Sequence, residues 1–351
     1  MAATAKRRIA VFRALQLGDM LVAVPALAAL RRGEPGAQIT LVGLPWAHDF
    51  ARRYASLLDD FLAFPGAPGL PEQADGGDAA LQRFFETARA RQFDLAIQLH
   101  GSGTLTNQIV SRLGARRVGG FFPGGAARPA APGLWVPWPG GNEISRLLAL
   151  TEALGYPSAD TRLSFPLQEH DAESWRRLAA EFGLRDGEFV CIHPGARMLS
   201  RRWPVERFAD VARQLQRRWR VVVTGAPDEA ALDARLCALI GGPVVNLCGR
   251  TSLGAMAALV AHARLLLCND TGASHIAAAV RTPSVVVSCG SDSGRWAPLD
   301  HTLHRVLAYH PPCRPCAWQS CPYGHECALR IEADTVAETA TQLAERPFHH
   351  A

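Results

Sequence analysis

The chain has 351 residues, of which 48% are hydrophobic, and a formal net charge of +5 at pH 7. That length exceeds one ordinary hydrophobic core and favours two domains. The mild positive charge suits an anionic small molecule or an anionic membrane surface and is too weak to indicate nucleic acid binding. No apolar run approaches the ~20 residues of a membrane span, and the N-terminus lacks a signal peptide's apolar core and cleavage site. We therefore expect a soluble cytoplasmic protein.

The first strand and the loop after it contain the first candidate site. Residues 9–13 predict a buried strand, and residues 20–32 predict an apolar helix in which Pro25 suggests a kink or a later start. Asp19 follows Gly18 and stands at the N-cap position of that helix. Two interpretations stay open: Asp19 is a plain helix cap, or it is a carboxylate on a glycine-opened loop that acts as a general base toward a hydroxyl.

The rest of the N-terminal half predicts further strands and one long loop. His100 follows a strand that opens into glycines, and a lone histidine there is more often structural than functional. Residues 121–141 are dense in proline and glycine and predict a long surface loop on the acceptor or membrane side. Trp135 and Trp138 within it are either interfacial anchors or packed loop aromatics. The strands are predicted at residues 38–42, 61–64 and 94–99.

The C-terminal half repeats the alternation of strands and helices. Residues 163–169 predict a linker, which gives domains of 1–166 and 167–351. Strands that alternate with helices imply a mostly parallel sheet in each domain. An amphipathic helix at 331–345 ends the chain. The strands of this half are predicted at residues 189–193, 220–224, 244–247, 265–268 and 284–288, and a helix is predicted at 171–182.

Two strand ends in this half carry charged candidates. Gly195 opens a loop that contains Arg201 and Arg202 ahead of a proline-started helix. Basic side chains beside a glycine and a helix start form a plausible diphosphate clamp, and a solvated basic loop is the alternative. Glu229 follows the next strand and either contacts ribose hydroxyls or is a first-turn helix charge.

The turn after residues 265–268 is the most informative stretch of the chain. Asp270, Thr271 and Gly272 lie between a buried strand and an Ala-rich helix that includes His275. Ligands of open α/β sheets bind at such turns, beyond the carboxyl ends of the strands, and the free N–H groups of the helix suit an anion such as phosphate. The alternative is that Asp270 caps the helix and that His275 packs beneath it.

Nine cysteines do not form a secreted disulfide framework. Five lie singly in apolar segments, as buried thiols do. The other four, with two histidines nearby, are either a structural zinc site or reduced thiols in a loop. These four are Cys313, Cys316, Cys321 and Cys327, and the histidines are His310 and His325.

In order along the chain, these motifs resemble glycosyltransferase family 9, the heptosyltransferases of lipopolysaccharide core synthesis. The resemblance spans nearly the whole chain, and its most specific part is the Asp-Thr-Gly-x-x-His run. The motifs are Leu17-Gly18-Asp19 with Pro25, Pro194-Gly195-Ala196 followed by Trp203-Pro204, and Asp270-Thr271-Gly272 with His275 and Ala277-Ala278.

The resemblance implies an α/β protein of the GT-B fold, with two Rossmann-like domains facing each other across a cleft. The N-terminal domain would bind the acceptor and the C-terminal domain the nucleotide sugar, and the last helix would cross back to the first domain. It further implies inverting transfer of a heptose from an ADP-activated donor to a sugar hydroxyl, without a catalytic metal or other cofactor. No Asp-x-Asp signature of metal-dependent transferases is present.

Carried over to this sequence, the family's pattern makes Asp19 the general base, with Gly18 allowing the loop to approach. Arg201 stands where the family usually has a lysine that contacts the donor phosphates. Arginine keeps the charge but not the geometry, so Arg202 competes for that role. The remaining donor-binding residues implied by the resemblance are Gly195, Glu229, Asp270, Thr271, Gly272 and His275.

The resemblance also implies partners and leaves two other functions open. The partners are ADP-heptose or a related nucleotide sugar and a lipid-linked oligosaccharide, with peripheral contact at the inner face of the inner membrane. The alternatives are a nucleotide-sugar epimerase of the same fold and a non-catalytic nucleotide-sugar-binding protein. Which sugar accepts, and which nucleotide sugar donates, does not follow from the sequence.

Overall fold

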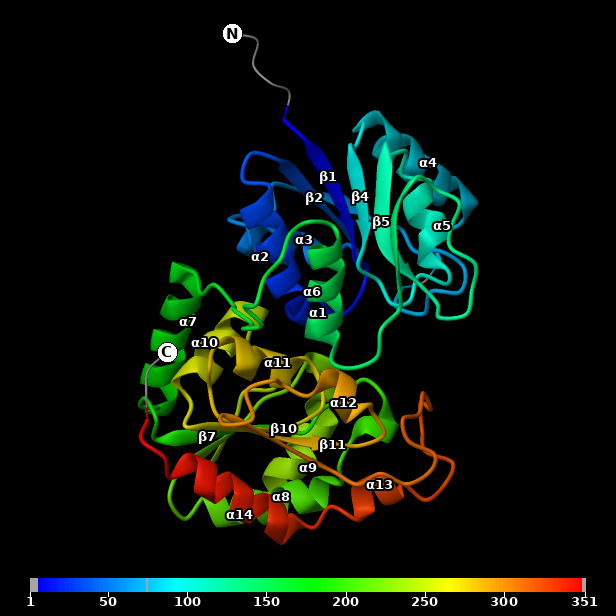
Figure 1. Ribbon diagram of the computed structural model, residues 1–351. Coiled ribbons are helices and arrows are strands. Elements are labelled where there is room, and N and C mark those ends of the chain that lie inside the picture. The colour runs from blue at the N-terminus through cyan, green and yellow to red at the C-terminus, as the bar shows by residue number, and fades with distance from the viewer. Residues whose placement is uncertain (1–5, 74, 349–351) are drawn as a thin grey trace. The chain divides into compact units, whose positions relative to one another are not determined.

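The computed structural model describes residues 6–73 and 75–348 (Figure 1). The chain divides into two compact units, with the boundary between Thr161 and Arg162. Each unit has its own six-stranded parallel sheet. The inner strands are buried on both faces, which is why residues such as Ile9 to Phe12 form continuous apolar runs.

The sheet of the first unit has the order β3-β2-β1-β4-β5-β6. Helices α4 and α5 pack on one face of it, and α2 and α6, which contact each other, lie on the other (Figure 1). The strands are β1 (Arg8–Phe12), β2 (Gln38–Gly43), β3 (Asp60–Ala63), β4 (Leu95–Gln98), β5 (Arg117–Phe122) and β6 (Gly133–Pro137). The helices are α1 (Leu17–Val22), α2 (Val24–Gly33), α3 (Ala47–Arg53), α4 (Asp78–Ala90), α5 (Thr106–Ser111) and α6 (Glu143–Ala153).

The sheet of the second unit has the order β12-β11-β10-β7-β8-β9. Helices α8, α9 and α14 pack on one face, and α7, α10 and α11 lie on the other (Figure 1). The strands are β7 (Phe189–His193), β8 (Arg220–Val223), β9 (Val244–Asn246), β10 (Leu265–Asn269), β11 (Ser284–Ser288) and β12 (His304–Ala308). The α-helices are α7 (Glu169–Phe182), α8 (Val205–Leu215), α9 (Ala230–Ile240), α10 (Leu253–His262), α11 (Gly272–Ala279), α12 (Ser293–Trp296), α13 (Glu326–Leu329) and α14 (Ala333–Ala344), and two 3₁₀ turns cover Leu199–Arg201 and Pro227–Glu229.

Both sheets have the same topology. When the strands are numbered 1 to 6 along the chain within each unit, both sheets have the order 3-2-1-4-5-6. This is the strand order of dinucleotide-binding Rossmann domains. The strand order reverses between β1 and β4 in the first unit and between β7 and β10 in the second. Ligands of such sheets bind beyond the carboxyl ends of the strands at that reversal. The loops after these four strands are therefore where each unit is expected to bind.

The prediction of one long loop over residues 121–141 is wrong. Strand β5 continues to Phe122, and β6 pairs with it in parallel, with Phe121 opposite Val136. Because β6 is an edge strand, the absent N–H of its terminal Pro137 breaks no inner ladder. The prolines and glycines around it concealed the strand. Strands β5 and β12 were also not predicted.

Both tryptophans of that segment pack against neighbouring side chains or main chain, as the packed-aromatic interpretation expects. Trp135 is buried, and its Nε1 donates to Ala131 O at 2.9 Å. Trp138 is half-buried, with its ring 4.9 Å from that of Phe121 and 4.8 Å from the guanidinium carbon of Arg146.

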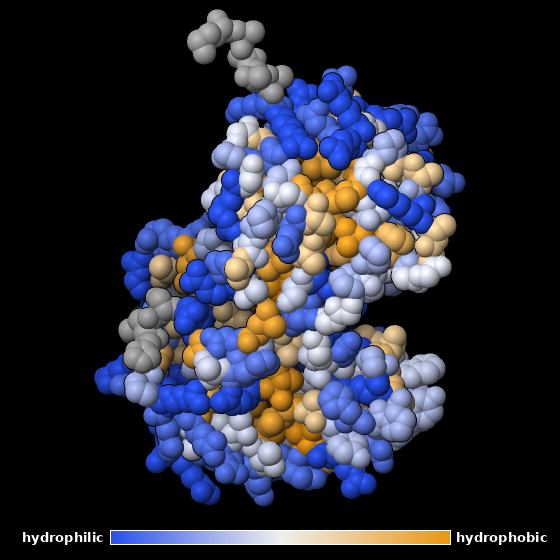
Figure 2. All heavy atoms as spheres, in the orientation of Figure 1, coloured by the Kyte–Doolittle hydropathy of each residue, from blue (hydrophilic) through white to orange (hydrophobic). Residues whose placement is uncertain are grey.

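The surface and the last helix complete the fold. On the face drawn in Figure 2, hydrophilic residues cover most of the surface, with apolar residues gathered in smaller areas between them. Among the described residues, none of the helices combines the length and apolarity needed to cross a bilayer. The apolar face of α14, which includes Val336 and Leu343, belongs to the core of the second unit.

Candidate active site

Asp19 lies in the first turn of α1, so its predicted N-cap position is wrong. The helix begins at Leu17, and the extended residue Gln16 is its N-cap. A helix can start earlier than its apolar pattern because its first N–H groups need no partner within the helix. The helix is interrupted at Ala23, and Pro25 occupies the first turn of a new helix, α2, which agrees with the prediction of a kink or a later start at this proline. The carboxylate of Asp19 is half-exposed beyond the carboxyl end of β1.

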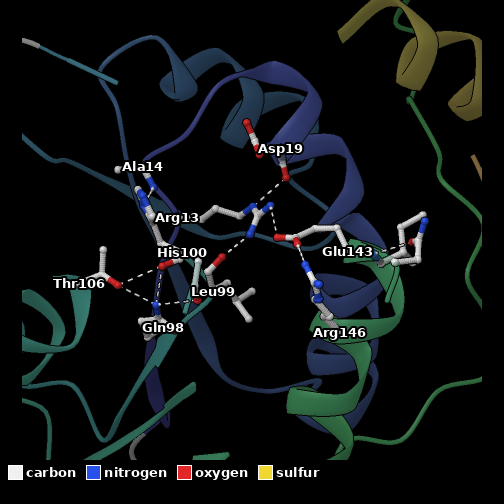
Figure 3. A network of polar contacts seen from close by, with 12 residues as sticks. Arg13, Ala14, Asp19, Gln98, Leu99, His100, Thr106, Glu143 and Arg146 are labelled. Atoms are coloured by element: carbon white, nitrogen blue, oxygen red, sulfur yellow. Dashed lines mark hydrogen bonds and ion pairs between the residues drawn. The ribbon is translucent and has the colours of Figure 1, made fainter. Parts of the chain in front are cut away.

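A buried ionic network holds the backbone beneath Asp19 (Figure 3). Arg13, which is 1% exposed, donates from Nε to Asp19 O at 2.7 Å and from Nη1 to Leu99 O. Its Nη2 lies 3.5 Å from Oε1 of Glu143, whose Oε2 is 3.3 Å from Nη1 of Arg146. One guanidinium thus ties together the loop after β1, the first turn of α1, the end of β4 and the start of α6.

His100 follows β4 and is a structural residue. Its Nδ1 accepts a hydrogen bond from Ala14 N at 3.3 Å, and its ring stacks on Phe12 with centroids 5.5 Å apart. Burial, helped by the charge of Arg13, lowers the pKa of His100 to about 3. The imidazole is therefore neutral at physiological pH, which agrees with the structural interpretation.

In the second unit, Glu229 faces the loop that Gly195 opens. Its Oε2 accepts from Ala226 N at 2.9 Å, which caps the 3₁₀ turn Pro227–Glu229, and lies 4.0 Å from Nε2 of His193. A Cβ placed on Gly195 would overlap the Glu229 carboxylate. Only glycine at position 195 therefore lets the Glu229 carboxylate come this close to the backbone. Burial lowers the pKa of His193, while the nearby carboxylate opposes that shift.

The two candidate arginines are held differently. Arg201 donates from Nη1 to Cys289 O at 3.4 Å and from Nη2 to Cys316 O. These hydrogen bonds attach its guanidinium to two main-chain carbonyls, so Arg201 is not a freely solvated side chain. Arg202 donates from Nε to Ala196 O at 2.8 Å. Each guanidinium has five N–H donors, so both retain donors for phosphate oxygens.

The turn after β10 excludes the cap interpretation of Asp270. Thr271 is the N-cap of α11, and the Asp270 carboxylate instead accepts from two serine hydroxyls. Helix α11 begins at Gly272, and His275 within this helix is 4% exposed. The prediction that these residues share one strand-to-helix turn is confirmed.

Sequence reasoning missed Asn269, the last residue of β10. It is fully buried, its Nδ2 donates to Pro194 O at 2.6 Å, and its Oδ1 accepts from Trp203 N at 2.9 Å. This one amide joins the loop after β7 to the turn that contains Asp270. The sequence signal that could have indicated Asn269 is a polar residue at the end of an otherwise apolar strand.

The four clustered cysteines do not form the zinc site that was one of their two interpretations. Cys327 is buried in the core, whereas Cys313 is exposed and the other two are half-exposed. Over the described ranges 6–73 and 75–348, no group of three or more His, Cys, Asp or Glu side chains is arranged to hold a metal ion.

Two parallel sheets of Rossmann topology, each with polar residues at its strand reversal, define an α/β protein of the GT-B fold class. The fold matches a family 9 glycosyltransferase of Veillonella parvula with a TM-score of 0.79 and 20% identity, over 99% of this chain and 100% of that one. It also matches the E. coli ADP-heptose lipopolysaccharide heptosyltransferase II with a TM-score of 0.71 and 19% identity, over 96% and 98% of the two chains.

The sequence comparisons identify the family. The model of glycosyltransferase family 9 (heptosyltransferase) matches residues 81–326, and the chain belongs to this family. It is 27% identical over 321 residues to lipopolysaccharide heptosyltransferase 3 of E. coli K12, which covers 88% of each chain. It is 25% identical over 334 residues to lipopolysaccharide heptosyltransferase 1 of Pseudomonas aeruginosa, over 90% of this chain and 88% of that one. The protein is therefore a glycosyltransferase, as the motifs predicted.

Proposed function

We propose that this enzyme transfers a heptose from ADP-heptose to a sugar hydroxyl of the lipopolysaccharide core, with inversion and without a catalytic metal. The relatives named above are lipopolysaccharide heptosyltransferases. A further solved structure of this fold, with a TM-score of 0.63 and 20% identity, is E. coli heptosyltransferase WaaC with ADP-2-deoxy-2-fluoro heptose. The observation that carries the proposal is that Asp19 and the Asp270 turn each lie at the strand reversal of their own sheet.

In the proposed reaction, Asp19 accepts the proton of the acceptor hydroxyl as that oxygen attacks the anomeric carbon of the donor. The bond from that carbon to the diphosphate oxygen breaks, and ADP leaves with the bonding electrons. Cationic groups and helix N–H groups stabilise the leaving charge. Arg201 is the proposed diphosphate contact, with Arg202 as its competitor. Donor binding is further assigned to Gly18, Gly195, Glu229, Asp270, Thr271, Gly272 and His275, with Gly18 allowing the loop to approach.

The deciding assay supplies ADP-heptose with and without a lipid A-linked core acceptor. Acceptor-dependent release of ADP supports transfer. Donor conversion without an acceptor would instead indicate an epimerase, and binding without turnover would indicate a non-catalytic binding protein. Running the assay over a panel of nucleotide sugars identifies the donor. The anomeric configuration of the product tests inversion, and full activity after chelation tests metal independence.

We further propose peripheral membrane contact through an exposed hydrophobic patch made of Leu199, Trp318 and Tyr323. These side chains are 49%, 48% and 60% exposed, and the two rings lie 6.2 Å apart. Ser200, next to Leu199, donates from Oγ to Trp318 O, so the two segments adjoin. Residues 309–325 contain no acidic residue, which suits an anionic lipid surface.

Vesicle sedimentation tests this patch. A variant with Trp318→Ser and Tyr323→Ser should bind vesicles of phosphatidylglycerol and phosphatidylethanolamine several-fold less than the unaltered protein. Its activity toward a water-soluble acceptor should be retained. Equal sedimentation of the two proteins would refute the assignment.

A further inference from the structure

Arg314 connects the cysteine-rich segment 309–325 to the donor-binding turn. The segment, drawn in orange in Figure 1, lies between β12 and α13. Arg314 donates from Nε to Ser291 O at 2.7 Å, from Nη1 to Tyr309 O at 2.7 Å and from Nη2 to Ser288 Oγ at 2.6 Å. It thus holds its own segment and the loop after β11 with one planar group.

Ser288 and Ser291 connect Arg314 to Asp270 through hydrogen bonds. Their hydroxyl oxygens are 2.8 Å apart. Ser288 Oγ lies 3.3 Å from Asp270 Oδ2, and Ser291 Oγ donates to the same oxygen. Ser288 is fully buried and Ser291 is 6% exposed, so water does not replace these partners readily.

The chemistry of the two ends fixes the direction of every hydrogen bond between them. A guanidinium only donates, and an ionised carboxylate only accepts. Ser288 must therefore accept from Arg314 and direct its own proton toward Ser291 or Asp270. Ser291 in turn donates to Asp270 Oδ2. Hydrogen bonds that end on a charged group are shorter and stronger than neutral ones.

One oxygen of Asp270 is occupied by this chain and the other is not. Across residues 6–73 and 75–348, no side chain or backbone N–H donates to Oδ1 of Asp270. The serines prevent the carboxylate from turning about its own axis, so Oδ1 keeps one direction. A fixed acceptor of this kind selects a hydroxyl group at one position of a ligand.

We propose that Arg314 is a positioning residue for the sugar donor, acting through Ser288 and Ser291 on Asp270. The cysteine-rich segment then has a role in the reaction that does not involve metal binding. The inference rests on the proposed function, because it takes Asp270 to be a donor contact. Arg314 itself touches no donor atom in this account.

A double-mutant cycle on the full-length enzyme tests the proposal. Arg314→Met should raise the donor KM about 10-fold, which corresponds to ~1.4 kcal/mol of donor binding. The same substitution should change kcat by less than about 3-fold. Arg314→Lys keeps the charge without the planar guanidinium, so its donor KM should lie between those of the unaltered enzyme and Arg314→Met. In an Asp270→Asn background, Arg314→Met should have an effect of less than about 2-fold.

The controls separate positioning from folding. Arg264 is also half-buried and donates to two main-chain carbonyls, Gly187 O at 2.9 Å and Arg346 O at 3.1 Å, but it lies at the start of β10, far along the strand from Asp270. Arg264→Met should leave the donor KM unchanged. If Arg314→Met does not fold, Ser291→Ala interrupts the same chain of hydrogen bonds and should give the same rise in KM.

The outcomes distinguish the two claims. An equal loss from Arg314→Met in both backgrounds would refute the positioning role, as would an unchanged donor KM in Arg314→Met and Ser291→Ala. An unchanged donor KM in Asp270→Asn would instead refute the proposed donor contact. Coupling between Arg314 and Asp270, together with a raised KM in each single variant, supports the inference.

Discussion

The buried pair of Arg13 and Glu143 makes a quantitative prediction about the first unit. Both side chains are 1% exposed. Arg13→Met would leave the Glu143 carboxylate paired with Arg146, and it would remove donors from Asp19 O and Leu99 O. Breaking a buried ion pair by removing one partner costs ~3–5 kcal/mol. Because Arg146 still compensates part of the charge, we expect about 3 kcal/mol.

Calorimetry of the full chain measures that loss. A unit of this size loses ~2–4 °C of Tm per kcal/mol, so the transition of the first unit should fall by about 6–12 °C. Arg116→Met is the matched control, because Arg116 is 84% exposed and pairs with Asp94 at 3.4 Å. An exposed pair contributes ~0–1 kcal/mol, so this Tm should change by less than about 4 °C. Equal shifts in the two variants would refute the assignment of Arg13 as the link beneath Asp19.

Two further predictions concern the second unit. Asp233 is buried, and burial raises its pKa from 3.8 to about 7, although a contact with the Cys248 thiol opposes that shift. The folded state therefore binds more protons between these values, and stability falls as pH rises from about 4 to 7. Asp233→Asn should raise the free energy of unfolding by about 1–3 kcal/mol at pH 8 and much less at pH 4, measured by urea unfolding, and the same gain at both pH values would contradict this. Gly195→Ala should raise the donor KM at least about 10-fold by displacing Glu229, whereas Gly36→Ala, whose Cβ would meet no atom within 4 Å, should not; an unaltered KM in Gly195→Ala would be inconsistent with the close approach.

The sequence predicted the strands of the second unit best. Residues 189–193 and 284–288 form strands with the predicted bounds, because fully buried parallel strands are uninterrupted apolar or β-branched runs. Strand β6 was missed because its flanking prolines and glycines resemble a loop. An edge strand tolerates such residues, and no local pattern states which strand lies at an edge.

The candidate site was predictable as a set of turns but not as a set of contacts. The positions of Asp19 and Asp270 after buried strands follow from local patterns. The bonds of Asn269 to the loop after β7, and of Arg314 to Ser288, join segments far apart in the chain. Long-range partners of this kind depend on sheet order, which the sequence alone left undetermined.

The most direct test of the account is the effect of Asp19→Asn on transfer and on donor binding, measured separately. The substitution keeps the side-chain volume and removes the base, so the transfer rate should fall by ~10²–10⁴, while the dissociation constant of the donor should change by less than about 2-fold. Asp49→Asn is the control, because Asp49 also lies in the first turn of a helix and its side chain is 90% exposed. A transfer rate in Asp19→Asn close to that of Asp49→Asn would contradict the central claim that Asp19 is the base.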